Sequence, residues 1–179
     1  PENYIPGRRT LISQLAFGIA AIPFAGLIYG ALKGKYDYRV HRLKLKFKDL
    51  PDAFHGFRIT QLSDIHCGSF DDANAVRHGI EMANAQNSDL MVFTGDFVNN
   101  KADELDEWHH LFSQLQAPHG KYSILGNHDY GDYIPWPSAE AKAQNMVKLQ
   151  RLQHNMGFRL LLKDRESTRL NSSHIPLSR

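Results

Sequence analysis

The sequence predicts an α/β domain, in which β-sheet is flanked by helices, preceded by a membrane helix. Two observations lead to this prediction. Short apolar strands alternate with helix-length amphipathic segments through the body of the chain, and residues 11–32 carry no charged side chain. Alternating strands and helices are typical of a largely parallel sheet with helices on its faces. The length of 179 residues fits one ordinary domain or part of a larger one.

The composition narrows the kinds of site that the chain can contain. With 42% hydrophobic and 22% charged residues, it is typical of a globular protein with an apolar core. The only cysteine, Cys67, excludes an internal disulfide framework and a cysteine-rich zinc module. Any metal site must therefore use His, Asp, Glu or Asn.

Charge is unevenly distributed along the chain, although the formal net charge is only +2. Residues 1–50 carry nine Lys and Arg against three Asp and Glu, whereas residues 51–163 carry nine against fourteen. A nucleic-acid-binding protein normally carries its basic patch on the folded body. We therefore expect no nucleic-acid partner. The excess of basic residues in 1–50 suggests a segment close to a membrane surface.

Residues 1–35 are predicted to form an N-terminal membrane anchor or signal segment. Leu11–Leu32 has no charge over 22 positions. A helix of that length is about 33 Å long, which matches the hydrocarbon thickness of a bilayer. A buried core helix and a cleaved signal have the same pattern and are the alternatives.

Two signals give opposite orientations to this segment. The pair Arg8 and Arg9, before a weakly apolar run, resembles a twin-arginine export signal. Cations just after a span tend to hold that side in the cytoplasm. Here they are Lys33, Lys35, Arg39, Arg42, Lys44, Lys46 and Lys48. We expect the periplasm or the outer face of the cytoplasmic membrane in preference to the cytoplasmic face, with the orientation left open.

Residues 36–163 are predicted to form the α/β domain. Arg42–Phe47 alternates basic and apolar side chains, which indicates a half-buried strand. The elements that follow are strand 57–62, helix 72–85, strand 90–94, helix 102–115, strand 122–125, a helix from an N-cap at Ser138 to a stop at Gly157, and strand 158–162. Within the second helix, apolar side chains recur at helical spacing and are predicted to be core. They are Leu105, Trp108, Phe112 and Leu115.

The tail, residues 164–179, is expected to be non-native. Asp164–His174 reads DRESTRLNSSH, has no apolar periodicity and closely resembles the translation of a sequencing adapter. We expect the native protein to continue past Lys163 with a different sequence. A short polar extension is the alternative.

Chemically distinctive residues follow three of the predicted strands. They are Asp64-Ile65-His66, Gly95-Asp96 and Gly126-Asn127-His128-Asp129. The carboxyl ends of parallel strands lie at one edge of a sheet, so these loops should converge although they are about 30 residues apart. Carboxylate, imidazole and amide groups suit a divalent cation such as Mn, Fe, Zn or Mg. The alternative is a chance gathering of polar loop residues.

These motifs resemble the pattern Asp-x-His, Gly-Asp, Gly-Asn-His-Asp/Glu of the calcineurin-like metallophosphoesterase family, over roughly residues 57–163. The resemblance is to a membrane-anchored bacterial type exported through a twin-arginine signal. It implies a sandwich of β-sheets flanked by helices, of which 36–163 is the N-terminal part. It also implies metal-dependent hydrolysis of phosphoesters by two divalent ions that activate water.

The resemblance also implies a role for each motif residue. Asp64 and His66 would bind the first metal, Asp96 would bridge both, and Asn127 would bind the second. His128 would act on the phosphate, with Asp129 as its orienting partner.

The chain departs from the family pattern after Asp129. The family supplies further ligands from a single His and a later Gly-His-x-His, but only His154 and His174 remain here. We therefore expect this chain alone to be inactive. A phosphoester substrate is implied, and the predicted anchor makes a lipid-linked one plausible. The alternative function is a non-catalytic, membrane-anchored binding protein that keeps the fold.

Overall fold

The computed structural model describes residues 6–32 and 34–162. The chain divides into two compact units, with the boundary between Leu43 and Lys44. The suspected non-native tail lies outside the described residues.

The N-terminal unit contains one long helix, α1 (Pro6–Leu32), followed by the short 3₁₀ helix η1 (Gly34–Tyr36). Its stretch Arg9–Gly30 is long and apolar enough to cross a membrane, and none of that stretch is buried. The predicted N-terminal apolar helix is therefore present. The finding of a possible span rests on length and composition only, and a core helix or a signal sequence passes the same test.

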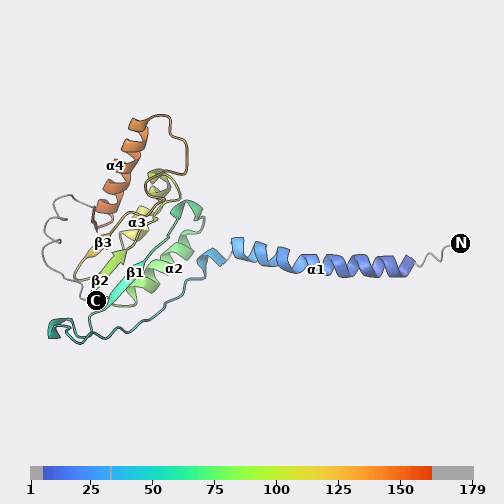
Figure 1. Cartoon of the computed structure of the whole chain (residues 1–179), viewed down its shortest axis with the longest axis horizontal. Helices are drawn as coiled ribbons and strands as arrows, with labels where there is room; N and C mark the ends of the chain where they lie inside the picture. Colours follow the sequence, from blue (N-terminus) through green and yellow to red (C-terminus); the bar gives the residue numbers. More distant parts are fainter. Residues whose placement is uncertain (1–5, 33, 163–179) are drawn as a thin grey trace, which may run out of the picture. The chain divides into compact units, whose positions relative to one another are not determined.

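The second unit is built on a four-stranded sheet in the order β1-β2-β3-β4, and every neighbouring pair is parallel (Figure 1). Its strands are β1 (Ile59–Leu62), β2 (Leu90–Phe93), β3 (Lys121–Ser123) and β4 (Phe158–Leu160). The register pairs Phe93 with Leu62 on one side and with Ser123 on the other. The predicted α/β class is confirmed.

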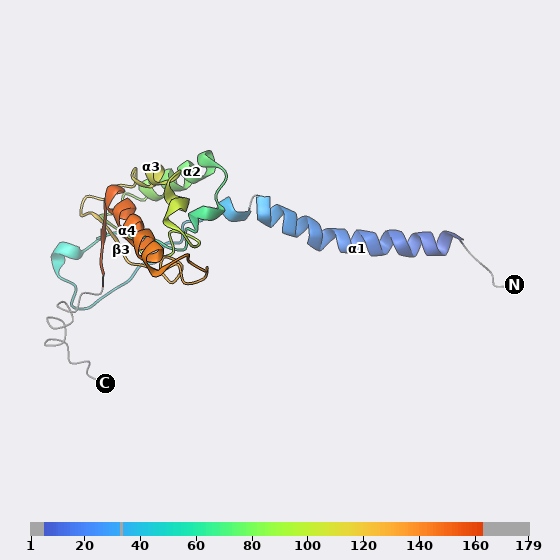
Figure 2. The ribbon, with the colours of Figure 1, turned by 90° about the horizontal axis from the view of Figure 1, so that it is seen from above.

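Helices connect consecutive strands, and the 3₁₀ helix η2 (Asp52–Phe54) precedes β1. The connecting helices are α2 (Ala73–Asn84), α3 (His109–Phe112) and α4 (Ala139–Asn155), together with the 3₁₀ helices η3 (Cys67–Ser69) and η4 (Ala102–Leu105). The α2 helix begins where Asp72 accepts the backbone N–H groups of Asn74 and Ala75, at 2.9 and 3.1 Å. Ser138 caps α4 in the same way, and Gly157, at φ +83°, follows its end. The helices α2 and α3 lie side by side (Figure 2).

The core lies between these helices and one face of the sheet. Phe93 of β2 stacks on Phe97, with 3.6 Å between ring centroids, and Phe97 meets Phe112 of α3 edge to face. Phe158 of β4 completes this aromatic group. Because this aromatic group is buried, it holds the end of β2 in place, and the Gly95-Asp96 loop follows that end.

The opposite face of the sheet carries apolar side chains that remain accessible. Ile59 is 57% exposed, and its register partner Leu90 is partly exposed. Val92 and Tyr122, which pair with each other, are also partly exposed. Monomeric proteins rarely leave a continuous apolar patch uncovered. Among the described residues this face is therefore the one with the least packing.

The predicted helix over residues 102–115 is wrong in one respect, because it is broken into η4 and α3. Lys148 of α4 binds the carboxylates of both Asp103 and Asp106, at 2.6 Å each, and holds the intervening turn. The four apolar residues predicted there are nevertheless buried.

The predicted strand Arg42–Phe47 is also wrong. The segment has no regular secondary structure, and its apolar residues Leu43, Leu45 and Phe47 are exposed. Alternation favours a strand only where a neighbouring strand supplies hydrogen bonds, and the described sheet consists of β1 to β4 alone.

Candidate metal centre

The three motif loops meet at the carboxyl edge of the sheet, as their positions after parallel strands predicted. Beyond β1, the chain stays bonded to the loop after β2: Asp64 N–H donates to Gly95 O at 3.1 Å. The His66 N–H likewise donates to Asp96 O at 3.0 Å. The two loops therefore continue side by side past the ends of their strands.

Three of the predicted metal ligands have a left-handed backbone. Asp64, His66 and Asp96 have φ values of +53°, +47° and +63°. Left-handed backbone costs a residue with a side chain about 1–2 kcal/mol. Such strain is concentrated at functional sites, where the surrounding structure holds the residue in place. Asn87 is the other residue of this kind in the described chain, and it lies in a turn elsewhere.

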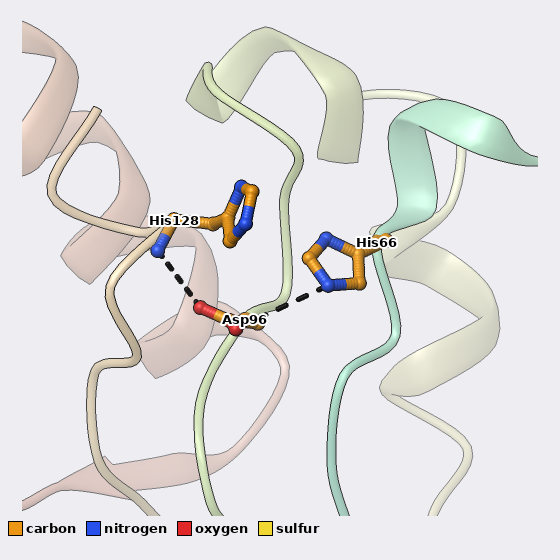
Figure 3. A group of neighbouring side chains, drawn as sticks. All are labelled: His66, Asp96 and His128. Atoms are coloured by element: carbon orange, nitrogen blue, oxygen red, sulfur yellow. Dashed lines mark hydrogen bonds and ion pairs between the residues drawn. The ribbon is translucent and has the colours of Figure 1, made fainter. Parts of the chain in front are cut away.

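The side chains of His66, Asp96 and His128 gather at one point, with one potential ligand atom from each lying within 4.8 Å of the others (Figure 3). Asp96 Oδ2 lies 4.0 Å from His66 Nε2. Its other oxygen, Oδ1, accepts the backbone N–H of His128 at 2.9 Å. The two imidazole rings are perpendicular, with centroids 4.7 Å apart.

Two motif glycines allow this close approach. A Cβ on Gly95, which has φ +104°, would lie 2.5 Å from Gly126 Cα. A Cβ on Gly126 would lie 2.6 Å from the backbone nitrogen of Asp96 and would collide with its carboxylate. Any side chain at either position would therefore push the second and third loops apart.

Asp129 is fully buried and joins the same two loops. Its Oδ2 accepts the N–H groups of Asp96 and Gly126, at 2.8 and 2.9 Å. Its Oδ1 accepts those of Phe97 and Val98, at 2.9 and 3.4 Å. Burial raises the pKa of this carboxyl, and the four N–H groups oppose that shift by stabilising the charged form.

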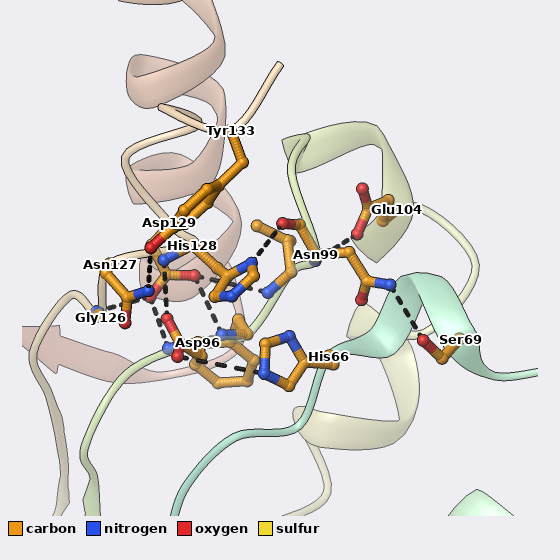
Figure 4. A network of polar contacts seen from close by, with 12 residues as sticks. His66, Ser69, Asp96, Asn99, Glu104, Gly126, Asn127, His128, Asp129 and Tyr133 are labelled. Atoms are coloured by element: carbon orange, nitrogen blue, oxygen red, sulfur yellow. Dashed lines mark hydrogen bonds and ion pairs between the residues drawn. The ribbon is translucent and has the colours of Figure 1, made fainter.

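His128 has a different hydrogen-bond partner from the one expected. Its Nδ1 lies 2.8 Å from the backbone oxygen of Asn99, whereas the Asp129 carboxylate faces backbone N–H groups (Figure 4). A carbonyl oxygen only accepts, so Nδ1 carries the proton and Nε2 carries the lone pair in the neutral ring. The group that orients His128 in this structure is therefore the Asn99 carbonyl.

The remaining two predicted ligands, Asp64 and Asn127, are both exposed. Asp64 is exposed, and its carboxylate is not part of the group within 4.8 Å. Asn127 is also exposed, and its Nδ2 donates to Tyr133 Oη at 2.7 Å, which leaves Oδ1 as its free acceptor. The Tyr133 ring lies on the His128 ring, with 4.6 Å between centroids.

Cys67 is buried beside the site rather than in it. Burial raises the pKa of its thiol, and the nearby carboxylates of Glu104 and Asp129 add to that shift. It is not a member of the His66, Asp96 and His128 group. A neutral thiol is a poor ligand and a poor nucleophile.

The donor set fits a divalent cation of the borderline to hard type. The buried carboxylate of Asp96 and the imidazoles of His66 and His128 converge. The amide oxygen of Asn127 belongs to the residue just before His128. The Asp96 carboxylate occupies a space that a side chain at position 126 would fill. Imidazole and carboxylate are the usual ligands of Zn, Mn and Fe in such sites.

Comparison with known proteins agrees with the fold. A model of the calcineurin-like phosphoesterase family matches residues 57–172, which is more than half of the chain and includes all three motif loops. The chain belongs to this family, whose members hydrolyse phosphoesters and bind divalent metals. No solved structure matches the chain significantly.

Several curated proteins are similar to it. An uncharacterised metallophosphoesterase, YkuE of Bacillus subtilis, is 35% identical over 62% of this chain and 43% of its own length. A transmembrane protein with a metallophosphoesterase domain from Danio rerio is 26% identical over 69% of this chain and 27% of its own length. The UDP-2,3-diacylglucosamine pyrophosphatase LpxG of Chlamydia trachomatis is 36% identical over 48% of this chain and 27% of its own length. The matches thus span less than half of these relatives.

Proposed function

We propose that the protein hydrolyses phosphoester bonds with a centre of two divalent metal ions. The observation that carries the proposal is the convergence of His66, Asp96 and His128, from three separate strand ends, to within 4.8 Å. Membership of the calcineurin-like family supports it.

The proposed ligands are the four side chains that the motifs predicted. Asp64 and His66 would hold one ion, Asp96 would bridge, and Asn127 would hold the other through Oδ1. The exposure of Asp64 and Asn127 is compatible with this role, because both lie on loops at the open edge of the sheet. When bound, such ions lower the pKa of water and neutralise charge on phosphate oxygens.

His128 is proposed to act on the substrate rather than as a ligand. Its Nδ1 proton is held by Asn99 O, so Nε2 is the nitrogen that can meet a phosphate oxygen. In the protonated ring, Nε2–H can donate to that oxygen or protonate the leaving group. Asp129 supports this role by joining the loops that carry Asp96 and His128.

A lipid-linked phosphoester is the substrate class that we favour. The relative named a UDP-2,3-diacylglucosamine pyrophosphatase supports this choice. So does the apolar helix α1, which would place the domain close to lipid. Soluble phosphomonoesters and cyclic nucleotides are the competing substrates, and one relative is named a probable cyclic nucleotide phosphodiesterase.

We further propose that residues 1–35 anchor the protein and that residues 36–163 contribute part of the catalytic domain. A membrane position is supported by α1 and by the transmembrane relative from Danio rerio. The pair Arg8 and Arg9 supports export to the periplasm or outer face.

The test is metal-dependent hydrolysis in detergent by the full-length protein, because residues 36–163 are proposed to be only part of the catalytic domain. After chelation, Mn²⁺, Zn²⁺ or Mg²⁺ should restore hydrolysis of an aryl phosphodiester or monoester, and Asp96→Asn should remove most of this activity together with bound metal. Equal rates in chelator and in Mn²⁺ would refute the proposal. Metal binding without hydrolysis of any phosphoester would favour the non-catalytic binding protein.

Aryl esters test the chemistry but not the substrate class, so a second comparison is needed. Rates for a nucleotide-linked lipid pyrophosphate in mixed micelles should exceed those for the water-soluble analogue without acyl chains. Equal rates would leave the catalytic proposal intact and remove the lipid preference.

A further inference from the structure

The loop after Gly95-Asp96 is held by a carboxylate that lies outside all three motifs. Glu104, in η4, accepts three consecutive backbone N–H groups through its side chain. Oε2 bonds Asn99 N at 2.5 Å, and Oε1 bonds the nitrogens of Asn100 and Lys101 at 3.0 Å each. Hydrogen bonds to an ionised acceptor are about twice as strong as neutral ones, so this carboxylate fixes the path of the loop.

The loop in turn contacts His128 directly and is linked to His66 through Ser69 (Figure 4). Asn99 O lies 2.8 Å from His128 Nδ1. The Asn99 side chain donates to Ser69 Oγ at 2.9 Å, and Ser69 N–H donates to His66 O at 2.9 Å. Asn99 therefore contacts the ring of His128 directly and is linked to the backbone of His66 through Ser69, and Glu104 holds Asn99.

Gly68 provides the room for Glu104 to reach this loop. A Cβ at position 68 would lie 2.6 Å from Glu104 Cδ and would collide with Oε2. The contact is with the end of a flexible side chain, so a methyl group at position 68 would displace the carboxylate rather than the backbone. This gives an independent way to disturb the same contact.

We propose that Glu104 is a positioning residue for His128: it holds the Asn99 carbonyl where that oxygen fixes the Nδ1–H tautomer and the ring orientation. The inference rests on the proposed function only for its effect on turnover. Loss of Glu104 leaves three loop N–H groups without their acceptor and frees the Asn99 carbonyl to move. The Nε2 lone pair of His128 then loses its fixed direction.

The direct test observes His128 itself and needs no metal. In protein labelled with ¹⁵N-histidine and kept metal-free in detergent at one fixed pH, the neutral form of the His128 ring should show a protonated Nδ1 and an unprotonated Nε2. Glu104→Ala and Gly68→Ala should each replace this pattern with a mixture of tautomers. Glu104→Gln, which keeps one acceptor oxygen, should retain part of it. The exposed neighbour Glu107 provides the matched control, and Glu107→Ala should leave the pattern unchanged.

Turnover of the full-length protein provides the second readout. Lost supporting contacts around a site typically reduce activity about 10- to 100-fold. Glu104→Ala should reduce kcat by that factor with KM and metal content within about twofold of wild type, and Glu104→Gln should recover part of the loss. Because Glu104 does not touch the proposed ligands, a fall in metal content equal to that of Asp96→Asn would contradict the positioning role.

The outcomes separate this inference from the proposed function. If the wild-type protein shows no metal-dependent hydrolysis, the proposed function is refuted. The ¹⁵N pattern would still show whether Glu104 positions His128. If Glu104→Ala fails to fold, Gly68→Ala and Glu104→Gln carry the same test. An unchanged His128 tautomer in the folded variants would overturn the inference.

Discussion

The carboxylate of Asp129 accepts the backbone N–H of Asp96, 33 residues earlier in the chain, at 2.8 Å. The last residue of the third motif thus fixes the second motif, while the backbone N–H of His128 is bonded to the Asp96 carboxylate at 2.9 Å. The reciprocal bonds make the two loops a single rigid support. In this structure Asp129 holds the two loops together through four backbone N–H groups.

Replacing Asp129 with Asn should destabilise the domain. The amide would turn an NH₂ group toward two N–H donors, where Asp129 offers acceptors on both sides. Buried donors left without partners cost about 1–3 kcal/mol, so we expect the free energy of unfolding in urea to fall by about 3 kcal/mol.

The control for this variant is Asp132→Asn. Asp132 is exposed and pairs with Lys142 on the surface, and exposed ion pairs contribute only about 0–1 kcal/mol. Similar losses in the two variants would show that the Asp129 bridge adds nothing beyond a surface contact.

Replacing His128 with Ala should impair chemistry more than metal binding. Loss of one donor to a developing charge typically costs about 10²- to 10³-fold in turnover. We expect kcat to fall by this factor with metal content close to wild type, measured by elemental analysis. A loss of metal as large as that of Asp64→Ala would make His128 a ligand, which its distance from His66 and Asp96 also allows.

Cys67 should resist alkylation in the native protein. Burial raises the pKa of its thiol, with Glu104 and Asp129 adding to the shift, and only the thiolate reacts readily. Iodoacetamide at pH 8 should modify the unfolded chain quickly and the folded chain slowly. Since the sequence has one cysteine, intact mass reports this site alone; fast labelling of folded protein would contradict the packing described around η3.

The protein should fractionate with membranes through α1. After lysis we expect it in the membrane pellet, resistant to alkaline carbonate, and in the soluble fraction once residues 1–35 are removed. Replacing Arg8 and Arg9 with Lys should retain the protein inside the cell if the twin-arginine interpretation is correct. Complete recovery of the uncleaved protein in the soluble fraction would exclude an anchor.

The sequence predicted those parts of the fold that depend on local signals. The N-cap at Ser138 and the stop at Gly157 are each recognised from a few neighbouring residues, and the structure confirms them. Convergence of the three motif loops follows from parallel strand order alone. The prediction of a strand at Arg42–Phe47 was wrong, because alternation of basic and apolar residues does not reveal whether a neighbouring strand exists.

The contacts around His128 were not predictable in the same way. The group that accepts from its Nδ1 is a backbone carbonyl, which every residue has. Glu104 belongs to a largely acidic run, residues 103–107, and such a run is typical of a solvent-exposed surface rather than of a buried contact. Tyr133 accepts a hydrogen bond from Asn127 because the loop after the last motif turns back toward it. Such contacts depend on backbone conformation, and no residue pattern specifies it.

The left-handed backbone at Asp64, His66 and Asp96 implies a conflict between stability and activity. Glycine adopts these φ values without steric cost, so at each position the residue that best suits the backbone has no side chain to bind metal. Selection for stability alone should drive all three positions toward glycine, and selection for catalysis should oppose it. Side chains that can bind metal therefore stand at three positions where glycine would cost the backbone less, as expected where function opposes stability.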